Sequence, residues 1–281
     1  MARLYVTDLD KTYLLSSGKA PDPQPWNELQ DQGVLLTFAT SRGARRAMGL
    51  LPQHNLRCRF VAYNGAVIWD PHAKPGPVLI NALSRPQLGK VLRLAEREGL
   101  PTPFILGFDT TGAERCLYEE IQNAGMQFFL NQRKGKPGAP EQVLHIAESS
   151  KILEHIIVMT FIADETSTYQ LQAAARGLGL GTKRYPDPYA EPGTWALEVL
   201  NPRADKGTAL LQLCEYYRLD PKDMTCFGDS LNDMDMFSVS GTSLAVANAL
   251  PEVKDMASTT LLWTNDEQAV TRYIRAQGGR P

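Results

Sequence analysis

The sequence predicts an α/β fold with two domains, a doubly wound parallel sheet and a smaller α+β domain inserted into it. One observation is that short apolar, β-branched runs alternate with segments of helical composition, which is the β-α-β order of a parallel sheet. A second is that this order changes after residue 83, where helices interleave with several strands. We therefore expect a core domain of residues 1–83 and 199–281 and an inserted domain of residues 84–198.

The first part of the core is predicted from apolar runs and from the residues that interrupt them. Residues 4–7 form a β-branched and aromatic run that is typical of a buried strand. Pro25 suits the first position of a short helix over 26–32, which Gly33 would end. The other elements expected here are a loop over 14–24, strands over 34–39, 59–63 and 66–69, a helix over 44–51 and a tight turn at 64–65.

The inserted domain begins with a helix over residues 86–98, whose apolar side chains recur on one face. The other elements expected in it are strands over 103–108, 155–162 and 195–199, helices over 113–124 and 165–176, and a loop over 132–140 rich in Gly, Lys and Pro. The chain then returns to the core with a helix that begins at Asp205 or Lys206, strands over 223–227 and 243–246, and a last helix over 265–275.

Composition excludes several classes of protein. The chain has 281 residues, of which 43% are apolar and 21% charged, as in an ordinary globular protein. The formal net charge of −2 gives no reason to expect a nucleic-acid partner. The four cysteines, Cys58, Cys116, Cys214 and Cys226, have no zinc-like spacing and indicate a reducing compartment.

No apolar run approaches the roughly 20 residues of a membrane helix. The first apolar run also meets Asp8 too early for a signal peptide. We therefore expect a cytoplasmic protein with a small-molecule ligand and without a membrane partner. The sequence leaves the oligomeric state open.

Two carboxylates follow the first strand directly. Asp8 and Asp10 are spaced i, i+2, so an extended chain directs them roughly to one side. Neighbouring carboxylates repel each other and stay ionised at low cost only beside a cation. Oxygen ligands on a short loop suit Mg²⁺. The structural alternative is a polar turn, because Asp also favours turns.

Three further places in the core carry candidate chemistry. Thr40 ends the second strand, where its hydroxyl could bind a phosphoryl oxygen or simply cap a helix. Lys206 lies in the first turn of a helix, where a cation is unfavourable; an exposed lysine is the alternative. Asp229 and Asp233 are four residues apart after the strand over 223–227 and would converge on one helical turn, although Asp229 could also serve as a helix cap.

These positions resemble a known family. Asp8-x-Asp10-x-Thr12, then Thr40, Lys206 and Gly228-Asp229-Ser230-Leu231-Asn232-Asp233 match, in order, the motifs of the haloacid dehalogenase superfamily of phosphohydrolases. The likeness is closest to the Cof-type, sugar-phosphatase-like branch with a class IIB cap. It implies a Rossmann-like core, Mg²⁺ as cofactor, and an inserted domain that closes over the core and selects the substrate.

The resemblance also implies roles for the core residues. Asp8 would attack phosphorus and form an aspartyl-phosphate, and Asp10 would serve as general acid and base. Mg²⁺ would be held by Asp8, by the backbone carbonyl of Asp10 and by Asp229, with Asp233 binding directly or through a water. The phosphoryl group would be bound by four residues, namely Thr40, Ser41, Lys206 and Asn232.

The substrate is less defined. The resemblance implies a small phosphate monoester, first a sugar or polyol phosphate and next a phosphorylated glycoside or a glycerate ester. Candidate substrate contacts are Arg42, Asn64, Lys183 and Arg184. Three positions depart from the usual motifs: Ser41 and Lys11 stand where many relatives have Gly, and Tyr13 stands where Leu is common. Lys11 adds a cation beside the leaving-group pocket or points to solvent.

Two other functions remain open from the sequence. A phosphomannomutase-like enzyme would share the motifs but return the phosphoryl group to a sugar. A non-catalytic phosphosugar-binding protein would keep the fold without the chemistry.

Overall fold

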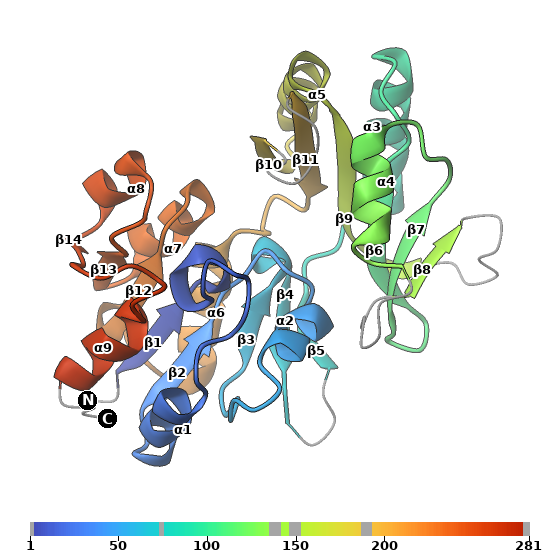
Figure 1. The fold of residues 1–281 in the computed structure, drawn as a ribbon. Coiled ribbons are helices and arrows are strands. Elements are labelled where there is room, and N and C mark those ends of the chain that lie inside the picture. The colour runs from blue at the N-terminus through green and yellow to red at the C-terminus, as the bar shows by residue number, and fades with distance from the viewer. Residues whose placement is uncertain (1–2, 73–75, 135–141, 146–152, 187–192, 278–281) are drawn as a thin grey trace. The chain divides into compact units, whose positions relative to one another are not determined.

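The structure is a computed structural model, and it describes residues 3–72, 76–134, 142–145, 153–186 and 193–277 (Figure 1). The chain divides into two compact units, one of Met1–Leu79 with Asp205–Pro281 and one of Ile80–Ala204. The domain boundaries expected from the sequence fall a few residues inside the second unit.

The first unit is organised around a parallel sheet in the strand order β14-β13-β12-β1-β2. β1 (Leu4–Thr7) lies between β2 (Leu35–Phe38) and β12 (Met224–Gly228), and all its residues are buried. A strand covered on both faces needs a continuous apolar run, which is why β1 does not alternate. The outer strands on the β12 side are β13 (Thr242–Ala245) and β14 (Thr259–Thr260).

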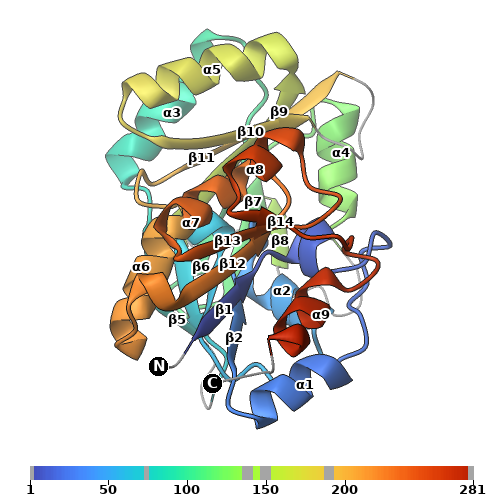
Figure 2. The same cartoon turned by 90° about the vertical axis from the view of Figure 1, so that its left-hand side faces the viewer.

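Helices cover both faces of this sheet. α1 (Gln24–Asp31) and α9 (Ala269–Ala276) pack together on one face, and α6 (Lys206–Tyr217) and α7 (Met234–Val239) pack together on the other (Figure 2). The predicted doubly wound α/β core is therefore confirmed. The other described α-helices of this unit are α2 (Ala44–Leu50) and α8 (Pro251–Met256).

A small antiparallel sheet extends the core beyond β2. It comprises β3 (Phe60–Ala62), β4 (Val67–Asp70) and β5 (Gly76–Ile80), and a parallel bridge joins Ala39 to Val61. The turn at Tyr63–Gly65 has three consecutive positive φ angles, of 51°, 52° and 99°. Gly65 runs so close to the backbone of Asp205 that no Cβ would fit there. Only glycine meets both requirements.

The second unit is built on a sheet in the order β10-β11-β9-β6-β7-β8. Helices α3 (Arg85–Arg97) and α5 (Glu165–Gly177) bury their apolar sides on one face, against Ile105, Met159 and Leu197. α4 (Ala124–Asn131) packs on the other face, where Phe129 lies against Phe104. The strands are β6 (Phe104–Asp109), β7 (Glu114–Tyr118), β8 (Gln142–His145), β9 (Leu153–Asp164), β10 (Gly181–Pro186) and β11 (Thr194–Leu200).

The helix predicted over residues 113–124 is wrong. The segment instead contains the strand β7, which pairs with β6 through a tight turn. Asp109 stabilises that turn by accepting hydrogen bonds from the backbone N–H groups of Thr111 and Ala113 and from the Arg115 side chain. The β6–β7 pair is a hairpin, and β7 also pairs with the more distant β8, so the helical composition of the segment alone did not reveal the strand.

Two smaller differences follow from tertiary contacts. The last helix begins at Ala269 rather than at 265, because Asn265 donates a hydrogen bond to the Leu14 carbonyl and Gln268 has a left-handed φ of 59°. The strand predicted over 243–246 is not the last one, since β14 pairs with it. The predicted loop over 132–140 lies mostly outside the described residues.

A buried aromatic cluster beside the first loop allows a test of acid stability. Tyr13 Oη and His54 Nε2 are 2.8 Å apart, and Trp26 packs on both rings. Burial lowers the pKa of His54 to about 4, although the negative charge of Asp22 opposes this shift.

The folded protein should therefore lose stability as pH falls. Below about pH 6.5 His54 is protonated in the unfolded chain but stays neutral in the folded protein, so unfolding is accompanied by uptake of a proton. The free energy of unfolding therefore decreases as the pH falls from about 6.5 to about 4. We expect His54→Gln to flatten this part of the urea-unfolding profile between pH 7 and pH 4. His72→Gln, at an exposed histidine, is the matched control. An unchanged slope in His54→Gln would contradict the assignment.

Candidate active site

The candidate site residues lie where the central parallel strands end. Asp8 follows β1, Thr40 lies two residues beyond β2, and Asp229 follows β12. These strands are hydrogen-bonded neighbours with matched registers, so their carboxyl ends reach the same edge of the sheet. This edge is where open α/β sheets bind ligands.

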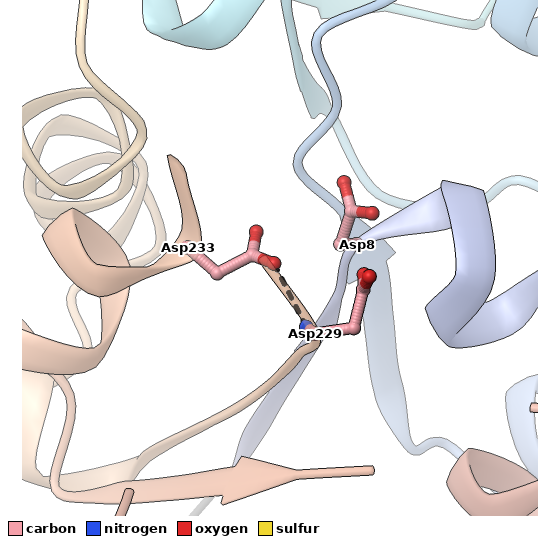
Figure 3. A group of neighbouring side chains, drawn as sticks. All are labelled: Asp8, Asp229 and Asp233. Carbon is pink, nitrogen blue, oxygen red and sulfur yellow. Dashed lines mark hydrogen bonds between the residues drawn. The ribbon is translucent and has the colours of Figure 1, made fainter. Parts of the chain in front are cut away.

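Three carboxylates meet at this edge (Figure 3). Asp8, Asp229 and Asp233 each offer one carboxylate oxygen, and these atoms lie within 4.8 Å of one another. Burial raises the pKa of Asp8 well above its usual range, and the neighbouring carboxylates add to the shift while Lys206 opposes it. Burial and the charge of Asp233 raise the pKa of Asp229 to about 7. A bound cation would offset both penalties, so this donor set fits a divalent metal ion.

Lys206 is the cation of the cluster. Its Nζ donates hydrogen bonds of 2.7 Å to Oδ1 of Asp8 and 2.7 Å to Oδ1 of Asp233, and its side chain is buried. Burial alone would lower the pKa of Lys206, but Asp233 and Asp8 outweigh it and hold the pKa above its ordinary value. The alternative of an exposed lysine is therefore excluded. Asp205 places Lys206 by capping α6 through the backbone N–H of Thr208, at 2.7 Å.

Asp233 also fixes the loop that follows β12. Its Oδ2 accepts hydrogen bonds from the backbone N–H groups of Asp229, at 2.9 Å, and Ser230, at 3.0 Å. A Cβ at Gly228 would lie 2.6 Å from Cβ of Asp233, so a glycine is needed for the chain to pass. Both carboxylate oxygens of Asp233 therefore have partners within the protein, and its position holds Asp229 in the cluster.

Thr12 also contributes to the cluster, although sequence reasoning gave it no role. Its Oγ1 donates a 2.8 Å hydrogen bond to Oδ1 of Asp229, which joins the first loop to the β12 end. The only signal in the sequence was its place in the Asp8-x-Asp10-x-Thr12 pattern. The hydrogen bond orients one oxygen of Asp229 and favours its ionised form.

Asp10 lies apart from this cluster and faces Arg42. Nε of Arg42 donates to Oδ2 of Asp10 at 2.8 Å, and Nη2 donates to Oδ1 at 2.5 Å. Arg42 was predicted to contact substrate, whereas the structure places it on Asp10. Its backbone N–H also donates to Oγ1 of the buried Thr40, at 3.2 Å, and Ser41 lies half-buried between them.

Asn64 and Asn232 connect two of these loops. The side-chain amide of Asn232 donates to Oδ1 of Asn64 at 3.1 Å, and the backbone N–H of Asn64 donates to the carbonyl of Thr40 at 3.0 Å. The left-handed turn at Tyr63–Gly65 thus braces the loop that carries Thr40. In the structure these two residues support their neighbours.

Lys183 and Arg184 belong to the second unit, on β10. Arg184 donates to Oγ1 of Thr168 at 3.1 Å, and its guanidinium lies 3.9 Å from the centre of the Trp195 ring. Lys183 is opposite Glu198 in the antiparallel pair of β10 and β11. These contacts explain how Arg184 is held within its own unit.

A buried acidic cluster bridged by a lysine, at the carboxyl edge of a doubly wound parallel sheet, is typical of a ligand-binding or catalytic site in an α/β protein. Comparison with known proteins makes the assignment specific. The family model of haloacid dehalogenase-like hydrolases matches residues 5–274, so the chain belongs to this family. The resemblance inferred from the motifs is confirmed.

Curated relatives are similar over nearly their whole length. The chain is 25% identical over 280 residues to an HMP-PP phosphatase of Cronobacter sakazakii, covering 98% of this chain and 95% of the relative. It is 26% identical over 279 residues to an HMP-PP phosphatase of Yersinia pseudotuberculosis, and this match covers 98% of this chain and 94% of the relative. Together with the family match, these relatives make the protein a phosphatase.

Solved structures agree in fold. A haloacid dehalogenase-like hydrolase from Bacteroides thetaiotaomicron superposes with a TM-score of 0.77 at 22% identity and covers 99% of this chain and 100% of that one. A second haloacid dehalogenase-like hydrolase, from B. subtilis, superposes with a TM-score of 0.74 at 18% identity and covers 97% of this chain and 99% of that one. Within the part of the chain that the structure describes, no helix has both the length and the apolar content needed to cross a bilayer.

Proposed function

We propose that the protein is a Mg²⁺-dependent phosphatase that hydrolyses a small phosphate monoester, a sugar or related phosphate, through an aspartyl-phosphate on Asp8. The observation that carries this proposal is the placement of Asp8. Its Oδ1 accepts a hydrogen bond from the buried Lys206, and one of its carboxylate oxygens lies within 4.8 Å of a carboxylate oxygen of Asp229 and of Asp233. A nucleophilic carboxylate must be ionised, and a neighbouring ammonium favours that state.

The residues would divide the reaction between them. Asp8 attacks phosphorus, while Asp10 protonates the leaving oxygen and later takes a proton from the hydrolytic water. Mg²⁺, held by Asp8, the backbone carbonyl of Asp10 and Asp229, with Asp233 as a direct or water-mediated ligand, would supply charge stabilisation of the phosphoryl group. Lys206 adds positive charge on the same side. The remaining phosphoryl contacts are assigned to Thr40, Ser41 and Asn232.

The second unit is proposed as the cap that selects the substrate, with Lys183 and Arg184 as candidate contacts.

The four cysteines are free and buried, in keeping with the cytoplasmic location expected from the sequence, which stays a prediction.

The ion pair between Arg42 and Asp10 yields a prediction about positioning. Its two hydrogen bonds orient the Asp10 carboxylate, so Arg42→Met should reduce kcat by about ten- to a hundredfold, with a smaller change in KM. Arg42→Lys should recover part of the loss, because a lysine can donate only one of the two bonds. Arg45→Met, at an exposed residue in α2, is the control. Equal kcat in wild type and Arg42→Met would contradict this role.

The function is tested by measuring phosphate release from purified protein with a set of phosphate esters. The set should contain sugar phosphates, polyol phosphates, glycerate esters, an aryl phosphate and HMP-PP, the compound named in the relatives. Activity should require Mg²⁺ and disappear with EDTA. An isomerised sugar phosphate in place of free sugar would indicate a mutase. Binding of phosphosugars without any turnover would indicate a non-catalytic protein.

A further inference from the structure

Lys11 occupies a backbone conformation that disfavours a side chain. It lies in the turn Leu9–Tyr13, between Asp10 and Thr12, and has a φ of 58° and ψ of 8°. Residues with a Cβ are strained in this left-handed region, which glycine adopts freely. The carbonyl of Lys11 accepts a 2.7 Å hydrogen bond from the side chain of Asn248, so the conformation is held from outside the turn.

Lys11 is exposed and belongs to the turn that follows Asp8. Its neighbour Thr12 bonds to Asp229, and the positive charge of Lys11 acts on the Asp229 carboxylate. Among the described residues, no carboxylate lies within 4.0 Å of the Lys11 ammonium, so it forms no ion pair there. Lys11 thus brings a cation to the site without a protein partner for it.

The other cations of the site are engaged. Lys206 bonds to Asp8 and Asp233, and Arg42 bonds to Asp10. In their ionised forms the carboxylates of Asp8, Asp10, Asp229 and Asp233 would outnumber these two cations by two, a difference that a divalent metal ion would offset. A phosphate ester would then bring further negative charge. Among the described residues Lys11 is the cation of this loop that no carboxylate pairs with.

We propose that Lys11 is a specificity-determining residue that binds a second anionic group of the substrate, so that preferred esters carry a carboxylate or a second phosphoryl group beside the one that is cleaved. This inference rests on the proposed phosphatase function and narrows its substrate class. A strained backbone, an exposed and unpaired ammonium, and proximity to the acidic cluster together support it.

The test compares pairs of esters that differ in this second group. Glycerol 2-phosphate and 2-phosphoglycerate share a carbon skeleton and differ by a carboxylate, whereas fructose 1-phosphate and fructose 1,6-bisphosphate differ by a second phosphoryl group. The measured quantity is the ratio of kcat/KM within each pair. The ratio is that of the doubly anionic ester to its partner with one anionic group. For the pair whose second group Lys11 binds, Lys11→Met should lower this ratio by about tenfold or more, mainly by raising KM for the doubly anionic ester. Lys11→Arg should preserve much of it. The two pairs distinguish a carboxylate from a phosphoryl group.

Lys222→Met is the matched control. Lys222 is also exposed, but it precedes β12 and so lies at the opposite edge of the sheet. Its substitution should leave both ratios as in wild type.

Binding without turnover gives a second readout. In an Asp8→Asn background, calorimetric titration with the recognised ester should show an affinity about tenfold lower when Lys11→Met is added. Lys11→Gly should lose the same selectivity while raising the melting temperature above that of Lys11→Met, because glycine relieves the left-handed strain.

The proposal is overturned if wild type shows no preference for the doubly anionic ester in either pair, or if Lys11→Met keeps the preference. Wild-type protein that releases phosphate from no ester would instead refute the proposed function. The two failures are therefore distinguishable.

Discussion

Asp8→Asn is expected to reduce phosphate release by at least about a thousandfold while the fold stays intact. An amide has no negative charge and cannot form the acyl phosphate on which the proposed reaction depends. The substitution is nearly isosteric, and its side-chain oxygen can still accept the hydrogen bond that Lys206 donates at 2.7 Å. Single-turnover phosphate release and acid-quench labelling of the protein with a ³²P-labelled ester would measure the effect.

Two measurements separate a chemical effect from a structural one. The midpoint of urea unfolding should change little, because Asp8→Asn also removes a buried charge whose ionised form is penalised by burial. Asp22→Asn, at an exposed residue, should retain full activity. Activity of Asp8→Asn close to that of wild type would refute the nucleophile.

Lys206→Met is expected to cause the largest loss of stability, about 3–5 kcal/mol in the free energy of unfolding measured without metal. The side chain is 1% exposed and bridges the carboxylates of Asp8 and Asp233. Removing the ammonium leaves buried negative charges without compensation, whereas methionine fills a similar volume. Phosphate release should also be lost, since the cation beside the nucleophile is gone.

The pH dependence follows from the direction of the shifts. The pKa of Lys206 is raised in the folded protein, so its contribution is complete at neutral pH and is lost only as pH rises above the ordinary lysine value of about 10.4. In Lys206→Met the raised pKa of Asp8 should rise further, so the loss of stability should shrink as pH falls and Asp8 becomes protonated. Urea unfolding at pH 5 and pH 8 would show this.

Lys222→Met is again the control, and its free energy of unfolding should stay within about 0.5 kcal/mol of wild type. If Lys206→Met were equally stable at both pH values and close to wild type, the buried bridge would not have the energetic role assigned to it.

The core was more predictable than the inserted domain. The runs that became β1, β2 and β12 are continuously apolar because both faces of their sheet are covered, so their pattern was visible in the sequence. In the second unit β7 was misread as a helix and β8 and β10 were not anticipated. Their strand character depends on pairing with other strands of the sheet, and the residue pattern of each segment by itself does not contain those partners.

The sequence by itself was enough to select the residues of the candidate site. The acids after the first strand and the pair of acids after β12 were selected by residue type and spacing together with the resemblance to the family's motifs, and the lysine that opens α6 was selected by that resemblance alone. Each follows a strand end or begins a helix, and these local positions are encoded by short stretches of chain.

Only the tertiary structure decided which partners these groups have. It placed Lys206 between Asp8 and Asp233, directed Arg42 onto Asp10, and left Lys11 exposed beside Asp229 without a carboxylate partner among the described residues. The physical reason is that burial and ion pairing depend on which parallel strands end side by side, and that order is set by packing over the whole domain.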